Sequence, residues 1–264
     1  MRVQNNRAGQ GWTWVRAGVR TFLRQPLAMS GLFFMFMAAV TLLSQLPLLG
    51  TLLAVALVPA ATLGLMAATR EAEQGRFPQP SLLIAAFRKP APRRRAMLTL
   101  GVLYAIGLLL VMGLSALLMG AAPPPVEGTE LTPAAVGAAL DRPGLLAVML
   151  VYVPLLMAFW HAPALVYWHG VAPAKSLFFS LLACWGNKGA MLVFVAGWAA
   201  VFLLTGLVLS LLGSLLGGPQ AISVVVYPLV LIMASMFHTS LWFTFRDSFR
   251  FDDAALPAGA PDAA

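Results

Sequence analysis

Residues 70–95 read REAEQGRFPQPSLLIAAFRKPAPRRR and hold seven of the seventeen lysine and arginine residues of the chain. A long uncharged run lies on each side of this connector, over residues 25–69 before it and residues 96–126 after it. Such runs are typical of transmembrane helices, since a helix needs about 20 apolar residues to cross the hydrocarbon core. The connector is therefore predicted to be a loop between spans, and its positive charge indicates the cytoplasmic side of the membrane.

The whole composition gives the same picture. Of the 264 residues, 60% are hydrophobic and only 10% are charged, whereas soluble domains carry about 25% charged residues. The net charge of +8 would suit a nucleic-acid ligand. The cations instead stand beside apolar runs, where membrane topology places them, so we predict no nucleic-acid partner. Cys184, the single cysteine, has no partner in the chain for an internal disulfide.

The uncharged runs divide into six spans, because Pro47 and the sequence Gly217-Gly218-Pro219 break the two longest ones. The predicted spans are Leu27–Leu46, Leu48–Thr69, Ala96–Ala122, Gly144–Trp168, Gly189–Leu216 and Ala221–Phe245. The runs are continuous and do not alternate as barrel strands do. We therefore predict an all-α polytopic bundle with one integral membrane domain over residues 1–245. Residues 246–264 are predicted to be a disordered cytoplasmic tail.

Orientation follows from the positions of the cations. With both termini inside, sixteen of the seventeen basic residues lie in the cytoplasm and only Arg142 lies outside. Because cytoplasmic loops carry the excess of lysine and arginine, we predict a multi-pass protein of the bacterial inner (plasma) membrane with both termini cytoplasmic.

An amphipathic helix is predicted just before the first span, over residues 12–25. Its apolar face holds Trp12, Val15, Val19, Phe22 and Leu23, and the neighbouring face holds Arg16, Arg20 and Arg24. This pattern is typical of a helix in the headgroup layer. Each arginine would add about 1 kcal/mol of attraction to anionic lipid. The alternative is a topology anchor without lipid preference.

The end of the connector offers a second set of candidate headgroup ligands, Arg93, Arg94 and Arg95. Arginine binds phosphate through paired hydrogen bonds, so this triplet is a candidate for a phosphate-bearing partner. The alternative is a charge block that only fixes orientation.

Short amphipathic segments also begin near Pro80 and Pro173, each before a further pair of spans. The chain is thus predicted to use one unit three times, an interfacial helix followed by a two-span hairpin. Small-residue stripes in the second and fifth spans favour packing inside the bundle, with a homo-oligomer seam as the alternative. They are Ala60, Gly64 and Ala68, and Gly206, Ser210 and Ser214.

Several short motifs carry a family resemblance. They are Gly11-Trp12-x-Trp14, Pro26, Arg70…Gly75…Pro78, Ala162-Pro163-Ala164-Leu165, Ser180…Asn187 and Arg246-Asp247-Ser248-Phe249. Together they resemble an uncharacterised family of six-span bacterial inner-membrane proteins. That family is distantly similar to the membrane domain attached to some glycerophosphodiester phosphodiesterases. The resemblance covers nearly the whole chain and implies location and fold. It implies no catalytic residue, and no part of the sequence reads as a phosphodiesterase domain.

The predicted spans contain no lysine, arginine, aspartate or glutamate, which argues against a carboxylate-based, ion-driven transporter. His161 and His238 each lie seventeen residues after the start of an inward-running span. At equal depth they are weak candidates for haem or metal ligation. The alternative is two histidines hydrogen-bonded near helix ends, and we predict no cofactor.

We therefore predict a non-enzymatic scaffold, accessory or lipid-interacting membrane protein. Its partners would be the lipid bilayer, including anionic phospholipid, and a second membrane protein or another copy of the chain. The alternative is a channel or facilitator for a small or lipid-like solute. That function would use an interior shaped by the prolines that interrupt spans, Pro59, Pro154, Pro163 and Pro228.

Overall fold

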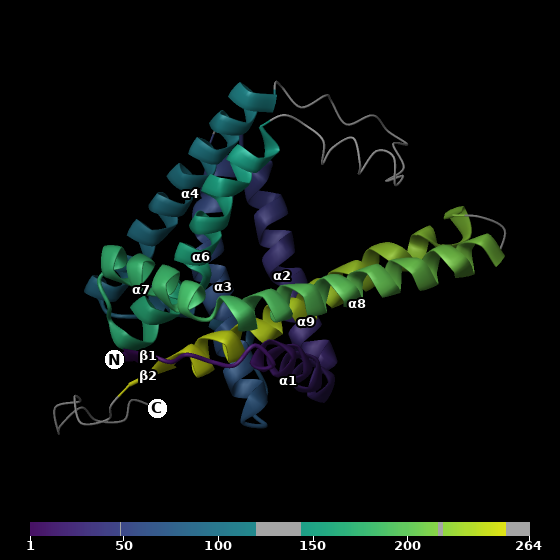
Figure 1. Ribbon diagram of the computed structural model, residues 1–264, viewed down its shortest axis with the longest axis horizontal. Helices are drawn as coiled ribbons and strands as arrows, with labels where there is room; N and C mark the ends of the chain where they lie inside the picture. The colour runs from purple at the N-terminus through teal and green to yellow at the C-terminus, as the bar shows by residue number, and fades with distance from the viewer. Residues whose placement is uncertain (48, 120–143, 216–218, 252–264) are drawn as a thin grey trace. The chain divides into compact units, whose positions relative to one another are not determined.

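The computed structural model describes all residues except 48, 120–143, 216–218 and 252–264. The described part is almost wholly helical (Figure 1). Its elements are β1 (Arg2–Val3), α1 (Gln10–Arg24), α2 (Pro26–Ser44), α3 (Gly50–Glu73), η1 (Pro80–Arg88), α4 (Ala91–Met119), α6 (Leu145–His169), α7 (Pro173–Gly186), α8 (Lys188–Leu215), α9 (Pro219–Ser248) and β2 (Phe249–Arg250). The two strands pair antiparallel, with Arg2 opposite Arg250.

Six helices of the described part are long and apolar enough to cross a membrane, namely α2, α3, α4, α6, α8 and α9. The prediction of an all-α polytopic membrane protein is confirmed. Their order also follows the predicted pattern, because a short helix precedes each pair of long ones: α1, then η1, then α7. The sequence also predicts a short helix over residues 132–140, between the third and fourth spans, and these residues lie outside the described part.

Some boundaries differ from the prediction. Helix α4 begins at Ala91, so the arginine triplet lies within its first five residues. Pro92 does not break this helix, because the first turn has no intrahelical partner for a backbone N–H and tolerates proline. Helix α9 continues to Ser248 and β2 follows directly. The first residues of the predicted tail are therefore ordered, and residues 252–264 lie outside the described part.

The described chain forms two compact units. Unit 1 comprises Met1–Ala38, Thr62–Ala85 and Leu182–Ala264, and unit 2 comprises Ala39–Ala61 and Ala86–Leu181. That residues 1–245 form one membrane domain stays a prediction, since a contact-defined unit need not fold separately.

In unit 1, α1 packs across α8 and α9, which run side by side (Figure 1). Two glycines allow the close approach. A Cβ at Gly11 would lie 2.1 Å from the carbonyl oxygen of Ala190, and one at Gly18 would lie 2.4 Å from the Cβ of Ser240. Trp14, between them, is fully buried. The buried face of α1 thus packs against α8 and α9.

The face of α1 that packs against the protein is not identical with the predicted apolar face. Val15 and Phe22 are buried, but Trp12 and Leu23, placed on the same face, are 47% and 60% exposed. The buried face is completed instead by glycine, threonine and Trp14. Glycine and threonine contribute little to an apolar periodicity, so the sequence pattern marks the face that carries the larger apolar side chains.

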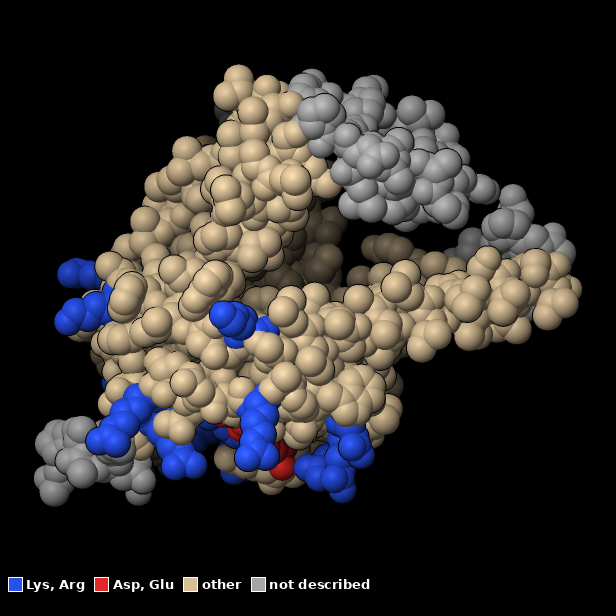
Figure 2. All heavy atoms as spheres, in the orientation of Figure 1, with Lys and Arg blue, Asp and Glu red and all other residues tan. Residues whose placement is uncertain are grey.

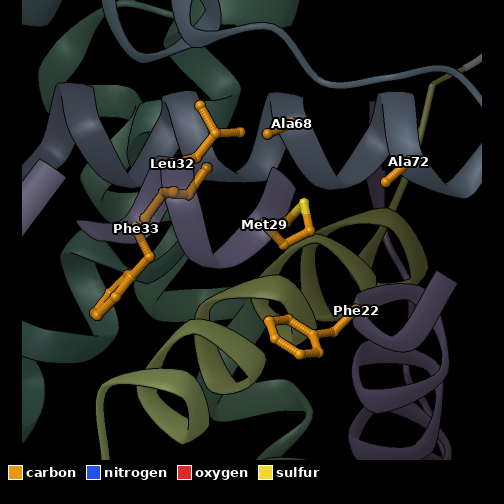
Figure 3. Close-up of a cluster of buried hydrophobic side chains, with 7 residues drawn as sticks. Phe22, Met29, Leu32, Phe33, Ala68 and Ala72 are labelled. Carbon is orange, nitrogen blue, oxygen red and sulfur yellow. The ribbon is translucent and has the colours of Figure 1, made fainter. Parts of the chain in front are cut away.

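A second contact holds α2 and α3 together in unit 1. Phe22, Met29, Leu32 and Phe33 pack with Leu65, Ala68 and Ala72 in a buried cluster (Figure 3). The small residues of α3 let the larger side chains of α2 approach its backbone closely. The entrance to the first long helix is thereby fixed against the end of the second, directly beside α1.

Unit 2 contains α4 and α6, which pack along each other. In α6, the backbone N–H of His161 donates to Ser180 Oγ at 2.8 Å, and that hydroxyl donates to the carbonyl of Met157 at 2.7 Å. A hydroxyl from α7 is therefore inserted where an α-helix would join these two backbone groups directly. Side-chain insertion of this kind is an established cause of helix kinks.

Candidate lipid-binding groove

A groove of about 830 Å³ runs along the exposed side of α1. Trp12, Val19 and Leu23 supply its apolar lining from α1. Charged side chains and one further aromatic ring also line it, from Arg16, Arg20, Arg24, Glu73, Phe243 and Arg246. All of these residues belong to unit 1. We call this feature the α1 groove.

The arginines of α1 differ in how they are engaged. Arg24 Nη1 donates to the backbone carbonyl of Glu73 at 3.3 Å. Arg16 and Arg20 are exposed, and neither makes an ion pair with any carboxylate that the structure describes. Two guanidinium groups one helical turn apart are thus available to an anion in this groove.

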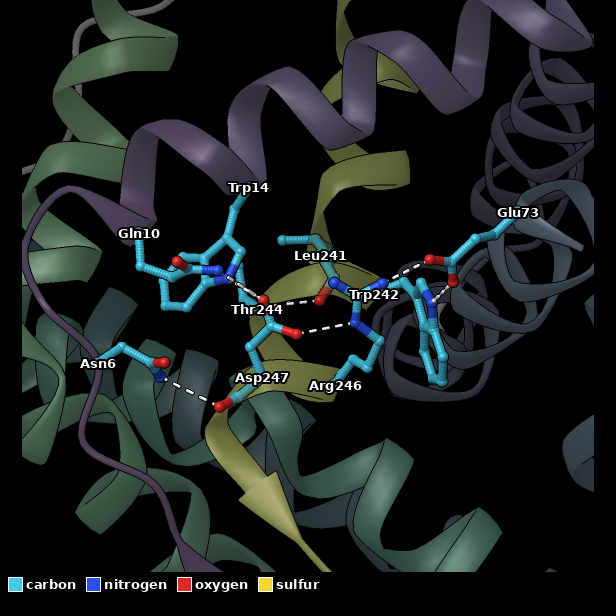
Figure 4. Close-up of polar contacts among 9 residues, drawn as sticks. All are labelled: Asn6, Gln10, Trp14, Glu73, Leu241, Trp242, Thr244, Arg246 and Asp247. Atoms are coloured by element: carbon cyan, nitrogen blue, oxygen red, sulfur yellow. Dashed lines mark hydrogen bonds and ion pairs between the residues drawn. The ribbon is translucent and has the colours of Figure 1, made fainter.

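The remaining arginine of the groove, Arg246, is held between two carboxylates (Figure 4). Its Nε lies 2.8 Å from Asp247 Oδ1, and its Nη1 pairs with Glu73 Oε1. Glu73 also accepts a hydrogen bond from Trp242 Nε1 at 2.7 Å. Glu73 supplies the one carboxylate among the described residues that line the groove. Because Arg246 largely offsets its charge, this carboxylate does not compete strongly for Arg16 and Arg20.

Asp247 ties the start of the chain to the end of α9. Its Oδ2 accepts hydrogen bonds from Gln10 Nε2 at 2.8 Å and from Trp14 Nε1 at 2.9 Å, and its backbone carbonyl accepts one from Asn6 Nδ2 at 3.1 Å. We call Asn6, Gln10, Trp14, Arg246 and Asp247 the Asp247 cluster. Figure 4 shows these side chains converging on the last turn of α9. The cluster fixes the position of α1, and with it the groove.

Asn187, at the junction of α7 and α8, adds a further tie. Its Oδ1 accepts from the backbone N–H of Asn6 at 2.6 Å, and its Nδ2 donates to the carbonyl of Gln4 at 2.8 Å. Sequence reasoning assigned no role to Asn187, Glu73 or Asp247. A signal existed for two of them, because Asn187 and Asp247 belong to the motifs that carried the family resemblance.

The other predicted headgroup ligands belong to unit 2. Arg93 Nη1 donates to the carbonyl of Tyr167 at 3.3 Å, and Lys89 Nζ lies 4.7 Å from the centre of the Tyr167 ring. Arg94 and Arg95 are exposed within the first five residues of α4. The triplet is therefore a candidate patch of its own, with one arginine engaged by the protein and two open.

The two histidines fall in different units. His161 is fully buried in α6 of unit 2. In α9 of unit 1, His238 Nδ1 lies 2.8 Å from the carbonyl oxygen of Ala234, and its ring centroid lies 5.0 Å from that of Phe33. In the part of the chain that the structure describes, no group of three or more histidine, cysteine or acidic residues is placed to hold a metal ion. Ligation of haem or a metal by His161 and His238 stays a hypothesis.

Charge is unevenly distributed over unit 1 (Figure 2). Lysine and arginine gather near α1 and the end of α9, with acidic atoms among them, whereas the outer part of the α8–α9 hairpin shows none on this face. Its exposed side chains include Leu203, Leu207 and Leu211. An uncharged apolar surface of this kind suits contact with lipid hydrocarbon.

Sequence comparison also indicates a membrane protein. Over 262 residues the chain is 36% identical to the probable inner membrane protein BTH_II0599 of Burkholderia thailandensis, in an alignment that covers 95% of this chain and 94% of the relative. The chain belongs to this family of inner membrane proteins. No family model matches it, and no solved structure matches it either. Together with the six apolar helices, membership identifies a multi-pass inner-membrane protein.

Membership also bears on the α1 groove. Only Gln25 separates the end of α1 at Arg24 from the start of the first long helix at Pro26. The arginine-bearing face therefore lies beside the start of a helix that is long and apolar enough to cross a membrane. Leu27, in the first turn of α2, is 89% exposed, which is expected of a side chain that contacts lipid at that level.

Proposed function

We propose that the protein is a non-enzymatic component of the inner membrane, a scaffold or accessory that binds anionic phospholipid on its cytoplasmic side. The observation that carries this proposal is the α1 groove, where Arg16 and Arg20 lie open beside Trp12 and Leu23. Cations near an anionic leaflet attract its headgroups. Exposed apolar side chains beside them can contact the acyl chains of the same lipids.

The orientation is part of this proposal. Both termini are proposed to be cytoplasmic, since that arrangement keeps sixteen of the seventeen basic residues inside. In a C184A background, the variants Arg7→Cys and Arg250→Cys should react with an impermeant maleimide only after the membrane is opened. Glu130→Cys should react in intact cells stripped of their outer membrane. The reverse labelling pattern would refute the orientation.

Arg94 and Arg95 are proposed as a second headgroup contact. The N-terminal end of a helix carries a partial positive charge, so three arginines among the first five residues of α4 repel it. A phosphate bound there would relieve that repulsion and would accept hydrogen bonds from both open guanidinium groups. This patch lies in unit 2 and can be tested separately from the α1 groove.

Lipid binding is tested with the full chain reconstituted in nanodiscs and challenged with fluorescent phosphatidylglycerol. Replacing Arg16, Arg20 and Arg24 with glutamine should weaken association on the order of a hundredfold at low salt, at about 1 kcal/mol for each charge. The control R7Q/R88Q/K175Q removes the same number of exposed charges outside the groove and should change association far less. Equal losses of lipid association in both variants would mean that binding depends only on net charge, and would refute the site.

The alternative of a channel or facilitator for a small or lipid-like solute has less support. Pro59, Pro154, Pro163 and Pro228 do lie inside helices. However, a hollow of about 260 Å³ between α3 and α4 of unit 2 is lined only by aliphatic side chains. It offers a polar solute no hydrogen-bond partner. The similarity to the membrane domain of glycerophosphodiester phosphodiesterases also stays a prediction, and the name of the relative specifies no enzymatic activity.

A further inference from the structure

We infer that the preferred occupant of the α1 groove is a phospholipid that carries two phosphates on one molecule, of the diphosphatidylglycerol (cardiolipin) class. This inference rests on the proposed function and specifies its ligand. Three features of the groove support it: its length, the spacing of its cations and its apolar lining.

The first feature is length. The groove extends along α1 from Trp12 to Arg24, which at a rise of 1.5 Å per residue corresponds to about 18 Å. That distance exceeds what one phosphate group covers. A single phosphate would occupy one turn of the helix and would leave the other arginines without an anion.

The second feature is the spacing of cations. Arg16, Arg20 and Arg24 recur every fourth residue, so neighbouring Cα atoms are about 6 Å apart along the axis and the outer pair about 12 Å apart. Two phosphates joined through a glycerol can each lie between a neighbouring pair of guanidinium groups. Arg24 is engaged through one bond to the carbonyl of Glu73 and keeps other donors for the second phosphate.

The third feature is the arrangement of apolar side chains. Trp12, Val19 and Leu23 line the groove over the same turns as the arginines. A lipid with two phosphates carries four acyl chains, so it presents apolar surface along the whole length that these side chains offer. The groove is thus complementary to such a lipid in charge and in apolar contact, whereas a single-phosphate lipid matches only one of its turns.

The experiment compares two anionic lipids on the full chain in nanodiscs, at equal total phosphate charge. The wild-type protein should retain cardiolipin in preference to phosphatidylglycerol, as measured by native mass spectrometry and by competition with a fluorescent cardiolipin. The variant R16Q/R20Q should weaken cardiolipin retention about thirtyfold, from about fivefold for each arginine. In this variant, cardiolipin should be retained no better than phosphatidylglycerol. The control R7Q/R88Q, with two exposed cations removed elsewhere, should keep the preference.

The possible failures are distinguishable. If neither anionic lipid is preferred over phosphatidylcholine, the proposed function itself is refuted. If both anionic lipids bind equally at matched charge and both are weakened by R16Q/R20Q, the groove stands and the two-phosphate inference falls. A cardiolipin preference that survives in R16Q/R20Q would also overturn it. The variant R16K/R20K provides a folded comparison that keeps charge but loses the forked donors, and an intermediate retention would support the inference. Retention equal to that of R16Q/R20Q would count against it.

Discussion

Removing the carboxylate of Asp247 should detach α1 from the end of α9 and destabilise unit 1. Asp247 Oδ2 accepts from Gln10 Nε2 and Trp14 Nε1 at 2.8 and 2.9 Å. Hydrogen bonds to a charged group contribute about 1.5–3 kcal/mol each. The Asp247 side chain is 18% exposed, so we take the lower end of that range. D247A should then cost about 3 kcal/mol. D247N should cost about half as much, since it keeps one acceptor oxygen.

The single cysteine supplies the assay. Cys184 is buried in α7 of the native protein, so a maleimide pulse labels it only in molecules that have opened. Labelling over a graded SDS series in mixed micelles gives an unfolding free energy for each variant. The control E71A removes an ion pair with Arg76 whose side chains are 30% and 59% exposed. Such a surface pair contributes about 0–1 kcal/mol.

A double-mutant cycle separates the indole bond from general damage. W14F removes the indole N–H that donates a hydrogen bond to Asp247 and keeps an aromatic ring at the same buried position. D247A should therefore cost about 1.5 kcal/mol less in the W14F background than in the wild type, and that difference is the coupling energy of the pair. A cost of D247A within about 0.5 kcal/mol of zero, or no coupling with W14F, would refute the Asp247 cluster as the support of α1.

Three further outcomes are expected. S180A removes the hydroxyl that joins His161 N–H to the Met157 carbonyl. It should lower the free energy of unfolding, measured by thermal unfolding, by about 1–3 kcal/mol. The control S214A, on an exposed part of α8, should lower it by less than about 0.5 kcal/mol. G18A should separate α1 from α9, because the new Cβ would meet Ser240 Cβ at 2.4 Å; it should raise proteolysis of the N-terminal segment, whereas G206A, with no atom within 4 Å, should not. Burial raises the pKa of the Cys184 thiol from an ordinary value of 9.0 to about 12, so the unfolded chain ionises first. Stability should therefore fall as pH rises from about 9 toward 12, and C184A should make that fall smaller.

The spans and their order could be predicted from the sequence, because the bilayer sets simple requirements. A crossing helix must be long and uncharged, and its ends are marked by proline, glycine or a cation. Pro47 and Pro219 mark such ends, and the helices beside them begin within a few residues of the expected positions. The same requirement explains why α4 was predicted to begin at Ala96 but begins at Ala91. Charge ends an apolar run, but it does not end a helix.

The supports of the groove could not be predicted. Gly11 and Gly18 lie at contacts that depend on where α8 and α9 pass, and a glycine reveals no such contact in a single sequence. Glu73 and Asp247 lie beyond the apolar runs, so they read as ordinary loop residues. Their pairing with Trp242, Trp14 and Arg246 depends on helix ends that are far apart in the chain. Composition and periodicity describe each segment by itself and do not contain that information.

The Asp247 cluster also explains why the α1 groove has open cations at all. Carboxylates are scarce in this chain, with nine in 264 residues, and Glu73 and Asp247 both pair with Arg246. Had either carboxylate faced Arg16 or Arg20, the groove would neutralise itself and an anionic lipid would gain little there. Both carboxylates are therefore engaged by Arg246, which leaves Arg16 and Arg20 open. Of the two, Asp247 also holds α1 in place through its side chain. A loss of lipid binding after D247A would follow from displaced cations, although every arginine of α1 remains.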